Sequence, residues 1–334
     1  MNTNKKKIIG IDVSKQTLDV SIYDGSKHEQ YRVRNKFADF ESKILSKLSN
    51  KNMDDLLFVL ENTGTYHLKL ANGLYERGYE ISVENPFKVK KYSEMLLCRS
   101  KTDAVDAKII AEFGYNIELN RYEPKSKEMS EIDQCLKAIE DFHKTISQMT
   151  SQIESLQNNP IISEVVLSNY EMSIKELKDK IKELESEIER IIKSHYLSEY
   201  KLLLGIPGVG KRLAAGVISV FGDRIGKFSN AKKMSSYLGL NPSIKESGTS
   251  VRGRGSIAKR GNRYLRKLLY MASLSAKKYN KSCKELYERL LSKGKAKKLA
   301  LIAVAHKLLR QIYAILLRGV AYDENYSGKI LTNI

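Results

Sequence analysis

Four acidic residues in the first third of the chain have the spacing of a cation-binding site. Asp12 and Glu61 each directly follow a short apolar run, as residues at the end of a strand do. Asp103 and Asp106 lie three positions apart in a segment with helical periodicity, so they share one helix face. Carboxylates gathered in one partly buried cluster repel one another unless cations neutralise them. The pattern therefore predicts that these four side chains hold metal ions.

The type of ligand indicates which ion such a site prefers. Oxygen ligands without Cys or His favour a hard cation, Mg²⁺ or else Mn²⁺, over zinc. Two such ions about 4 Å apart can hold a phosphodiester and stabilise both the attacking and the leaving oxygen. Simpler roles stay open, because Asp12 can form a turn and Asp103 can cap the helix that follows it. Asp19 and Asp24 are weaker candidate ligands.

The elements that would position these acids form an α/β domain. Short apolar or alternating runs predict strands, and amphipathic segments predict helices. The expected strands are 8–13, 17–23, 30–33, 56–60 and 80–83, and the expected helices are 37–48, 66–77, 86–96 and 103–113. Strands that come first as a meander and then alternate with helices indicate a mixed sheet.

Two heptad seams follow the α/β block. Their apolar positions alternate three and four residues apart: Ile132, Cys135, Ile139, Phe142, Ile146, Met149, Ile153 and Leu156, then Leu167, Tyr170, Ile174, Leu177, Ile181, Leu184, Ile188 and Ile191. Between them, Asn159 is expected to cap a helix that begins at Pro160. The seams predict a long helical coiled coil, either a hairpin within the chain or a contact between subunits. In both cases it is a spacer that carries no chemistry.

The positive charge of the chain is concentrated after the seams. The net charge is +19, but residues 1–199 carry 30 basic and 33 acidic side chains. Residues 200–323 carry 27 basic and 5 acidic side chains, a net charge of +22. A polyanion, most simply nucleic acid, is the expected partner of this block.

A glycine-rich turn opens the basic block. The stretch LGIPGVGK formally contains GxxxxGK, but Arg212 follows where a nucleotide-binding loop needs Ser or Thr, and a helix precedes it. The pattern instead predicts a helix-hairpin-helix-like element. Its backbone amides at Gly208, Gly210 and Lys211 would bind phosphate without reading sequence. A plain turn between two helices is the alternative.

Further along, seven basic residues occur with no acid between them. They are Arg252, Arg254, Lys259, Arg260, Arg263, Arg266 and Lys267. Such uncompensated charge beside glycines favours phosphate contacts. Residues 277–298 add more basic side chains with Tyr279 and Tyr287 among them, which makes this stretch a second candidate surface for DNA or RNA.

Cysteine use and hydropathy indicate the compartment. Cys98, Cys135 and Cys283 have no paired spacing, which is typical of a reducing cytoplasm and offers no zinc framework. Three lysines before the first apolar run imitate a signal peptide, but Asp12 ends that run too early. The longest apolar stretch, 213–221, is far shorter than a membrane span. The prediction is a soluble cytoplasmic protein with no membrane partner.

Three short segments resemble a known family. IIGIDVSK, LENTG and SKTDAVDA are similar, in this order, to the motif blocks of the DEDD transposases of insertion sequences, which have a RuvC-like domain and include the pilin-gene invertases. The resemblance implies a ribonuclease-H-like fold on which Asp12, Glu61, Asp103 and Asp106 are the metal-binding tetrad. The source would then be a prokaryote.

The stretch GLNPSIKESGTSVRGRGSIAKRGNRYLR resembles the second conserved domain of the same family, whose loop serine is the nucleophile. Ser247 is the aligned match. Glu246 before it departs from the family pattern, so Ser243, Ser250 and Ser256 are alternatives.

The resemblance implies a DNA transposase or site-specific recombinase that forms a covalent phosphoserine with donor and target DNA. It also implies a noncoding bridge RNA as guide, and a dimer or tetramer with active sites shared between subunits. The expected domains are 1–124 RuvC-like, 125–200 coiled coil, 201–325 basic helical transposase domain and 326–334 tail. The alternatives are a junction-resolving nuclease that activates water on the same metal site, and a non-catalytic nucleic-acid-binding scaffold.

Overall fold

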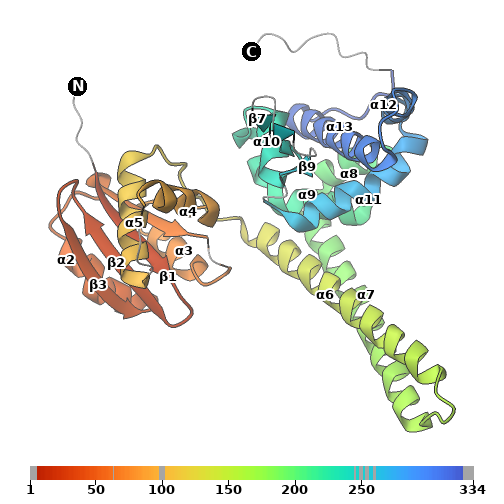
Figure 1. The fold of residues 1–334 in the computed structure, drawn as a ribbon, viewed down its shortest axis with the longest axis horizontal. Helices are drawn as coiled ribbons and strands as arrows, with labels where there is room; N and C mark the ends of the chain where they lie inside the picture. The colour runs from red at the N-terminus through yellow and green to blue at the C-terminus, as the bar shows by residue number, and fades with distance from the viewer. Residues whose placement is uncertain are drawn as a thin grey trace. The chain divides into compact units, whose positions relative to one another are not determined.

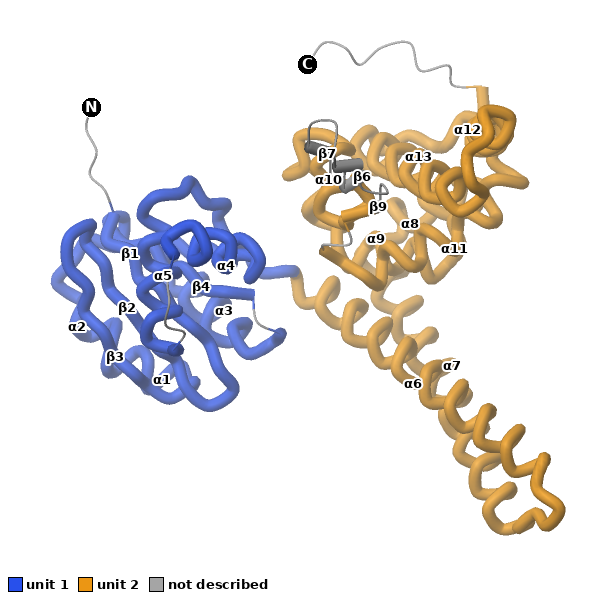
Figure 2. The backbone as a smooth tube through the Cα atoms, in the orientation of Figure 1, with its two compact units in different colours: residues 1–125 blue, residues 126–334 orange. Residues whose placement is uncertain are grey.

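The computed structural model describes residues 6–62, 64–97, 102–243, 246–247, 251–252, 256–258 and 261–325. The chain folds as two compact units, residues 1–125 and residues 126–334, which Figure 2 shows in blue and orange. The first unit holds a sheet with helices, and the second is mostly helical (Figure 1). The predicted combination of an α/β part and an α part is confirmed at this level.

A mixed sheet forms the centre of the first unit (Figure 1). It has five strands in the order β3-β2-β1-β4-β5. The first three strands are an antiparallel meander, and β1, β4 and β5 are parallel neighbours. The strands are β1 (Lys7–Val13), β2 (Thr17–Tyr23), β3 (His28–Arg34), β4 (Leu56–Glu61) and β5 (Glu80–Glu84). The mixed sheet expected from the alternation of strands and helices is therefore present.

Helices cover both faces of this sheet. They are α1 (Phe37–Phe40), α2 (Ser46–Leu48), α3 (Leu68–Glu76), α4 (Pro86–Met95) and α5 (Asp103–Asn116), with the π-turn η1 (Glu41–Leu45) and the 3-10 turn η2 (Met53–Asp55). Ile9 and Ile11 pack into one buried cluster with Phe40 and Leu74, whereas Ile8 joins a second cluster that includes residues of α5. The helix predicted over 37–48 is confirmed in its bounds, and η1 is one wide turn inside it.

The second unit begins with two long helices, α6 (Lys127–Gln157) and α7 (Glu164–His195), that pack side by side as a hairpin (Figure 1). A supercoiled geometry for them stays a prediction. The start expected at Pro160 is wrong: α7 begins at Glu164, with Ser163 as its N-cap residue. Helix axes that pack 8–10 Å apart need a connection of several residues to reverse direction, so 159–163 form the turn.

The remaining helices form the core of the second unit. They are α8 (Leu197–Leu204), α9 (Lys211–Phe221), α10 (Ala231–Leu238), α11 (Arg263–Tyr279), α12 (Lys281–Ser292) and α13 (Lys297–Arg318), with the 3-10 turn η3 (Gly222–Lys227). Two pairs of two-residue strands lie between α10 and α11: β6 (Pro242–Ser243) with β9 (Ser256–Ile257), and β7 (Glu246–Ser247) with β8 (Val251–Arg252). For these strands the backbone alone is described, except at Ile257.

Helix α13 has a composition that hydropathy alone would misread. Among the described residues it is the one helix long and apolar enough to cross a membrane, and it was not predicted from the sequence, where 213–221 is the expected longest apolar stretch. Its buried side chains, Val304, Leu308 and Ile312 among them, belong to the same core cluster as Leu265 and Leu269 of α11. Packing inside the second unit accounts for the buried part of its apolar surface.

Candidate acidic metal site and basic contact surfaces

Strand register places the first two predicted ligands next to each other. Ile11 of β1 pairs with Leu60 in the parallel β1–β4 ladder, and Asp12 and Glu61 are the next residues on the two strands. Both acids therefore lie at the carboxyl ends of adjacent parallel strands. They are partly buried, so their charges interact through a medium less polar than water.

The other two predicted ligands come from the first turn of α5, and glycines determine how closely this helix approaches the sheet. A Cβ atom on Gly10 would lie 2.3 Å from the backbone nitrogen of Ala111, and one on Gly114 would lie 2.9 Å from Ile8. Helix α5 therefore runs antiparallel to β1, in direct backbone contact with it. Its N-terminal turn consequently lies toward the end of β1 that carries Asp12, on the same sheet face as Gly10.

The cap of α5 differs from one reading of the sequence. Thr102, and not Asp103, is the N-cap residue, and its hydroxyl accepts a hydrogen bond from the Val105 amide at 3.3 Å. Asp103 and Asp106 are thus free of the capping role and lie inside the first turn.

The electrostatics of Asp12 reflect the proximity of the three other acids. The pKa of Asp12 is raised to about 6, first by burial and then by repulsion from Glu61, Asp106, Asp103 and Asp19, in that order. A single carboxyl group therefore senses all three other members of the predicted tetrad.

The four acids lie in one region of the first unit but do not form a ready coordination cluster. Within the described ranges, which include all four, no three acidic, His or Cys side chains lie close enough together to hold a metal as they stand. Asp103 instead makes an ion pair with Arg32, whose Nη2 lies 3.3 Å from its Oδ2. The donor set fits a hard divalent cation, since it consists of carboxylates whose mutual repulsion such a cation would relieve.

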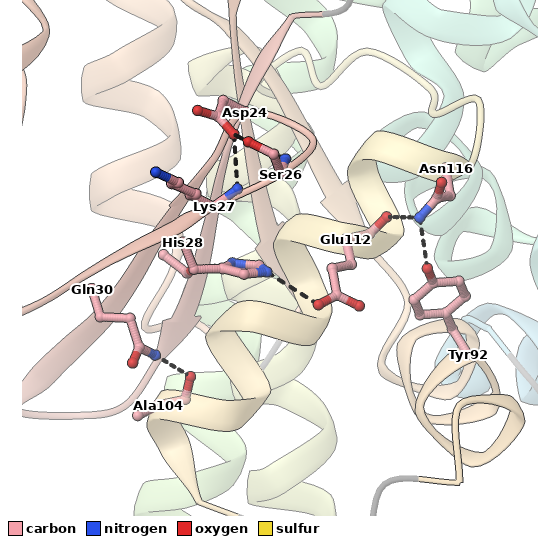
Figure 3. A network of polar contacts seen from close by, with 10 residues as sticks. Asp24, Ser26, Lys27, His28, Gln30, Tyr92, Ala104, Glu112 and Asn116 are labelled. Carbon is pink, nitrogen blue, oxygen red and sulfur yellow. Dashed lines mark hydrogen bonds and ion pairs between the residues drawn. The ribbon is translucent and has the colours of Figure 1, made fainter.

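The two weaker candidate ligands have different surroundings. Asp19 is buried, pairs with Asp12 across the β1–β2 ladder and contributes to the raised pKa of Asp12. Asp24 lies in the β2–β3 turn, where it accepts hydrogen bonds from the backbone amides of Ser26 and Lys27 (Figure 3). These bonds hold its pKa well below the usual range, so Asp24 is a turn-forming residue.

The glycine-rich turn lies between α8 and α9, as predicted. Gly208 has a φ of +102°, and a Cβ atom there would lie 2.7 Å from the Cβ of Ala276. Gly210 is the N-cap residue of α9. The local chain thus has the outline of two helices joined by a tight glycine turn, while phosphate binding by its amides stays a prediction.

Several predicted phosphate-binding cations already have protein partners. Lys211 pairs with Glu189 at 2.6 Å, and Lys267 pairs with Glu140 at 3.2 Å. Both acids belong to the α6–α7 hairpin. Arg266 donates to the carbonyl of Leu238 at 2.7 Å. These contacts tie the base of the hairpin and α10 to α9 and α11, whatever else the cations bind.

The predicted nucleophile loop is described in part. Ser247 pairs with Val251 in the β7–β8 ladder, and Arg252 pairs with Glu246. Ser243 and Ser256 face each other in the β6–β9 ladder. Ser250, Arg254, Lys259 and Arg260 lie outside the described residues, and Arg263 is the first residue of α11.

A second basic surface, whose lysines make no ion pairs with described residues, begins at the C-terminal end of α11. We name eight lysines the lysine surface: Lys277, Lys278, Lys281, Lys284, Lys293, Lys295, Lys297 and Lys298. None of them has an ion-pair partner within the part of the chain that the structure describes, although Glu285 and Glu288 share the exposed face of α12. Tyr279 beside them is 70% exposed, and Lys277 Nζ lies 4.8 Å from the centre of the Tyr287 ring.

Two positions of the acidic site, Arg32 and Gly10, were not predicted from the sequence. For Arg32, the available signal was Asp19, a charged residue inside the otherwise apolar strand 17–23. For Gly10, it was a glycine in the middle of a strand, which often marks a close approach of another backbone.

The fold and the site together define a class of protein. Acids at the ends of adjacent parallel strands, joined in one chain to a basic helical unit, are typical of enzymes that process nucleic acids. Residues 9–159 match a family model described as a transposase of the DEDD IS110 type, and residues 200–288 match one described as transposase IS116/IS110/IS902 family. The chain belongs to this transposase family and is a DNA transposase or recombinase.

Relatives along the whole chain agree with this assignment. The pilin gene-inverting proteins of Moraxella lacunata and Moraxella bovis are both 29% identical, over 324 and 327 residues, which is 96% of this chain and 98% of each relative. An uncharacterized 43.6 kDa protein of insertion element IS110 from Streptomyces coelicolor is 29% identical over 160 residues, 48% of this chain and 38% of that protein.

Proposed function

We propose that this enzyme cleaves and rejoins DNA at a Mg²⁺ site held by Asp12, Glu61, Asp103 and Asp106, with Ser247 as the nucleophile. The observation that carries the proposal is the convergence of three acids on the partly buried carboxyl group of Asp12. Arg32 pairs with Asp103 but compensates only part of this charge, and like charges gathered in such a place destabilise the fold, so a bound cation is the simplest reason for them. Mn²⁺ has the same ligand preference and is expected to substitute.

In this proposal the four acids hold the metal ion, and Ser247 attacks the DNA. When bound, a hard divalent cation supplies positive charge opposite the oxygens of the scissile phosphate. The hydroxyl of Ser247 attacks phosphorus, so an Oγ–P bond forms while the bond to one sugar oxygen breaks and that oxygen takes a proton. Attack by the sugar hydroxyl of another strand reverses this step, which frees Ser247 and joins the new strand.

The RuvC-like assignment of the fold belongs to the same proposal. It is supported by the strand order, by the acids at the ends of β1 and β4, and by the placement of α5 on the face that carries Asp12. Donor and target DNA are the substrates. A noncoding bridge RNA and a dimer or tetramer with shared active sites are the partners that family membership favours.

Among the described residues of the basic block, the lysine surface is a group of cations able to bind a nucleic-acid backbone without first breaking an ion pair. It has eight cations without ion-pair partners among the described residues, whereas Lys211 and Lys267 are each paired with an acid. Its two clusters lie at the two ends of α12, a helix of 12 residues and hence about 18 Å long. At about 3.4 Å per phosphate on one strand, this length faces roughly five phosphates of a duplex.

The test is a covalent trapping assay on the full-length protein. Labelled DNA carrying the element's junction, with Mg²⁺ and the element's transcripts, is quenched in detergent and examined for label that migrates with protein. Wild type and the control Glu118→Gln, an exposed acid, should form the adduct. Ser247→Ala and Asp12→Asn should not.

Each contrary result would indicate a different function or a different catalytic residue. Strand cleavage by Ser247→Ala without an adduct would mean a nuclease that activates water. An adduct formed by Ser247→Ala but lost in Ser250→Ala would move the nucleophile within the loop. Full recombination by Asp12→Asn would leave the acids without a catalytic role and favour a scaffold.

A further inference from the structure

One row of charged side chains crosses the first three strands of the sheet beside the proposed metal site. Asp12 on β1 pairs with Asp19 on β2, and Asp19 pairs with Arg32 on β3. Residues directly opposite each other on neighbouring strands point to the same face, so the three side chains lie in one line under α5. Arg32 is therefore a cation built into the acidic cluster.

Arg32 bridges two acids. Its Nε lies 3.6 Å from Asp19 Oδ2, and its Nη2 lies 3.3 Å from Asp103 Oδ2. The Asp19 side chain is only 9% exposed, and a buried carboxylate without a nearby cation is costly. Arg32 thus stabilises Asp19 and, with the other end of its planar guanidinium group, occupies Asp103.

Arg32 belongs to a series of β3 side chains that hold α5. Gln30 Nε2 donates to the carbonyl oxygen of Ala104 at 2.7 Å, and His28 Nε2 lies 3.1 Å from Glu112 Oε1 (Figure 3). His28, Gln30 and Arg32 alternate along the strand and so share one face. The uncharged contact of Gln30 positions the same turn of α5 without adding charge to the acidic cluster, which makes it a matched comparison for Arg32.

The guanidinium group has room to move away from Asp103. An open surface depression of about 320 Å³ adjoins it, lined by Asp19, Gln30, Arg32 and Ala104 together with Val20 and Tyr31. The Arg32 side chain is 61% exposed, so a rotation toward solvent does not require the core to open. The contact with Asp103 can therefore break while the fold stays intact.

We propose that Arg32 is a positioning residue that acts as a resident counter-ion: it holds Asp103 while the site is empty and yields it when a divalent cation binds. The inference rests on the proposed metal site. It explains why the acids are gathered in this structure but not closed, because one of them is held toward β3 by an internal cation. When a divalent cation binds, the ion pair of Asp103 with Arg32 is replaced by one with the metal, so Asp103 has a cationic partner in both states.

This exchange gives a signature that a purely structural residue would not produce. Without metal, Arg32→Ala should lower the melting temperature of the first unit, since Asp19 and Asp103 lose their cation. In this variant no guanidinium group competes with the metal for Asp103. Mn²⁺ should therefore bind about 2- to 10-fold tighter to the variant than to wild type. Gln30→Ala should also lower the melting temperature, but it should not tighten Mn²⁺ binding, because it removes no cation from the acidic cluster.

The experiment is calorimetric titration of the full-length protein with MnCl₂, without nucleic acid, together with thermal melts in EDTA. Asp103→Asn tests the linkage: once Asp103 is neutral, the further change Arg32→Ala should no longer tighten Mn²⁺ binding. Equal or weaker Mn²⁺ binding by Arg32→Ala, with Asp12→Asn abolishing binding, overturns the role of Arg32 and keeps the metal site. Unchanged binding by Asp12→Asn overturns both.

Discussion

Replacing Asp12 by Asn should stabilise the metal-free protein at neutral pH, although it should abolish activity. Burial and four neighbouring acids raise the pKa of Asp12 to about 6 in the folded chain, against 3.8 for an unperturbed Asp. At about 1.36 kcal/mol per pH unit, this difference sets an upper limit of about 3 kcal/mol on the cost of the charge. Asp12 is only partly buried, so solvent screening reduces the expected effect to about 2 kcal/mol.

The direction of the pH dependence follows from proton binding. Between about pH 4 and pH 6 the folded chain keeps the Asp12 proton that the unfolded chain has lost, so the free energy of unfolding falls as pH rises. Wild type should therefore lose about 2 kcal/mol across this window relative to Asp12→Asn. The variant and wild type should be equally stable near pH 3.5, where Asp12 is mostly protonated in the folded state.

Differential scanning calorimetry in EDTA is the appropriate assay, because the chain has no Trp. At pH 7.5 the transition of the first unit should be higher in Asp12→Asn by on the order of 6–10 °C. Adding Mg²⁺ should raise the wild-type transition and leave that of the variant in place. Glu118→Gln, at an exposed acid of the same unit, controls for a general charge effect. If wild type and Asp12→Asn melt together at both pH values, the acids do not converge as described.

Three further predictions concern the scaffold and the nucleic-acid surface. Gly10→Ala should destabilise the first unit by about 3 kcal/mol or more, measured by calorimetry, because the new Cβ would meet the backbone of Ala111 at 2.3 Å; a small loss would refute the contact with α5. Gly208→Ala should lower the free energy of unfolding by about 2–4 kcal/mol in urea titrations, because Gly208 has a φ of +102° and its new Cβ would contact Ala276. Gly210→Ala, whose Cβ would meet open space, should lower it by about 1 kcal/mol or less. Alanine at any two lysines of the lysine surface should lower the slope of log Kd for duplex DNA against log salt by about 1.8, and an unchanged slope would place the phosphate contacts elsewhere.

Local patterns were sufficient to predict the strands and the acids at their ends. Asp12 and Glu61 follow apolar runs, and the helix between β4 and β5 indicates parallel pairing, so their neighbourhood follows from short stretches of sequence. The helix over 37–48 was predicted with the right bounds, but its apolar spacing is compatible both with a regular helix and with one that contains a wide π-turn. Composition patterns do not distinguish the two.

Features that depend on register between elements were not predictable in this way. The contact of Arg32 with Asp19 depends on how β2 and β3 align, and one residue of slip would place the two side chains on opposite faces. The net charge of a segment likewise gives no information on ion pairs between segments. Lys211 counts toward the positive half of the chain, yet its partner Glu189 belongs to the acidic half.

The burial pattern of the α6–α7 hairpin makes its far end adjustable in length. The buried side chains of the two helices are confined to 129–139 of α6 and 181–192 of α7, next to the helical core. Because the seams repeat every seven residues, deleting one heptad from each arm shortens the hairpin by about 10.5 Å and leaves the packing at its base in register. The exposed turn at 159–163 is accordingly a natural insertion point for a fluorophore, an affinity tag or a second folded domain.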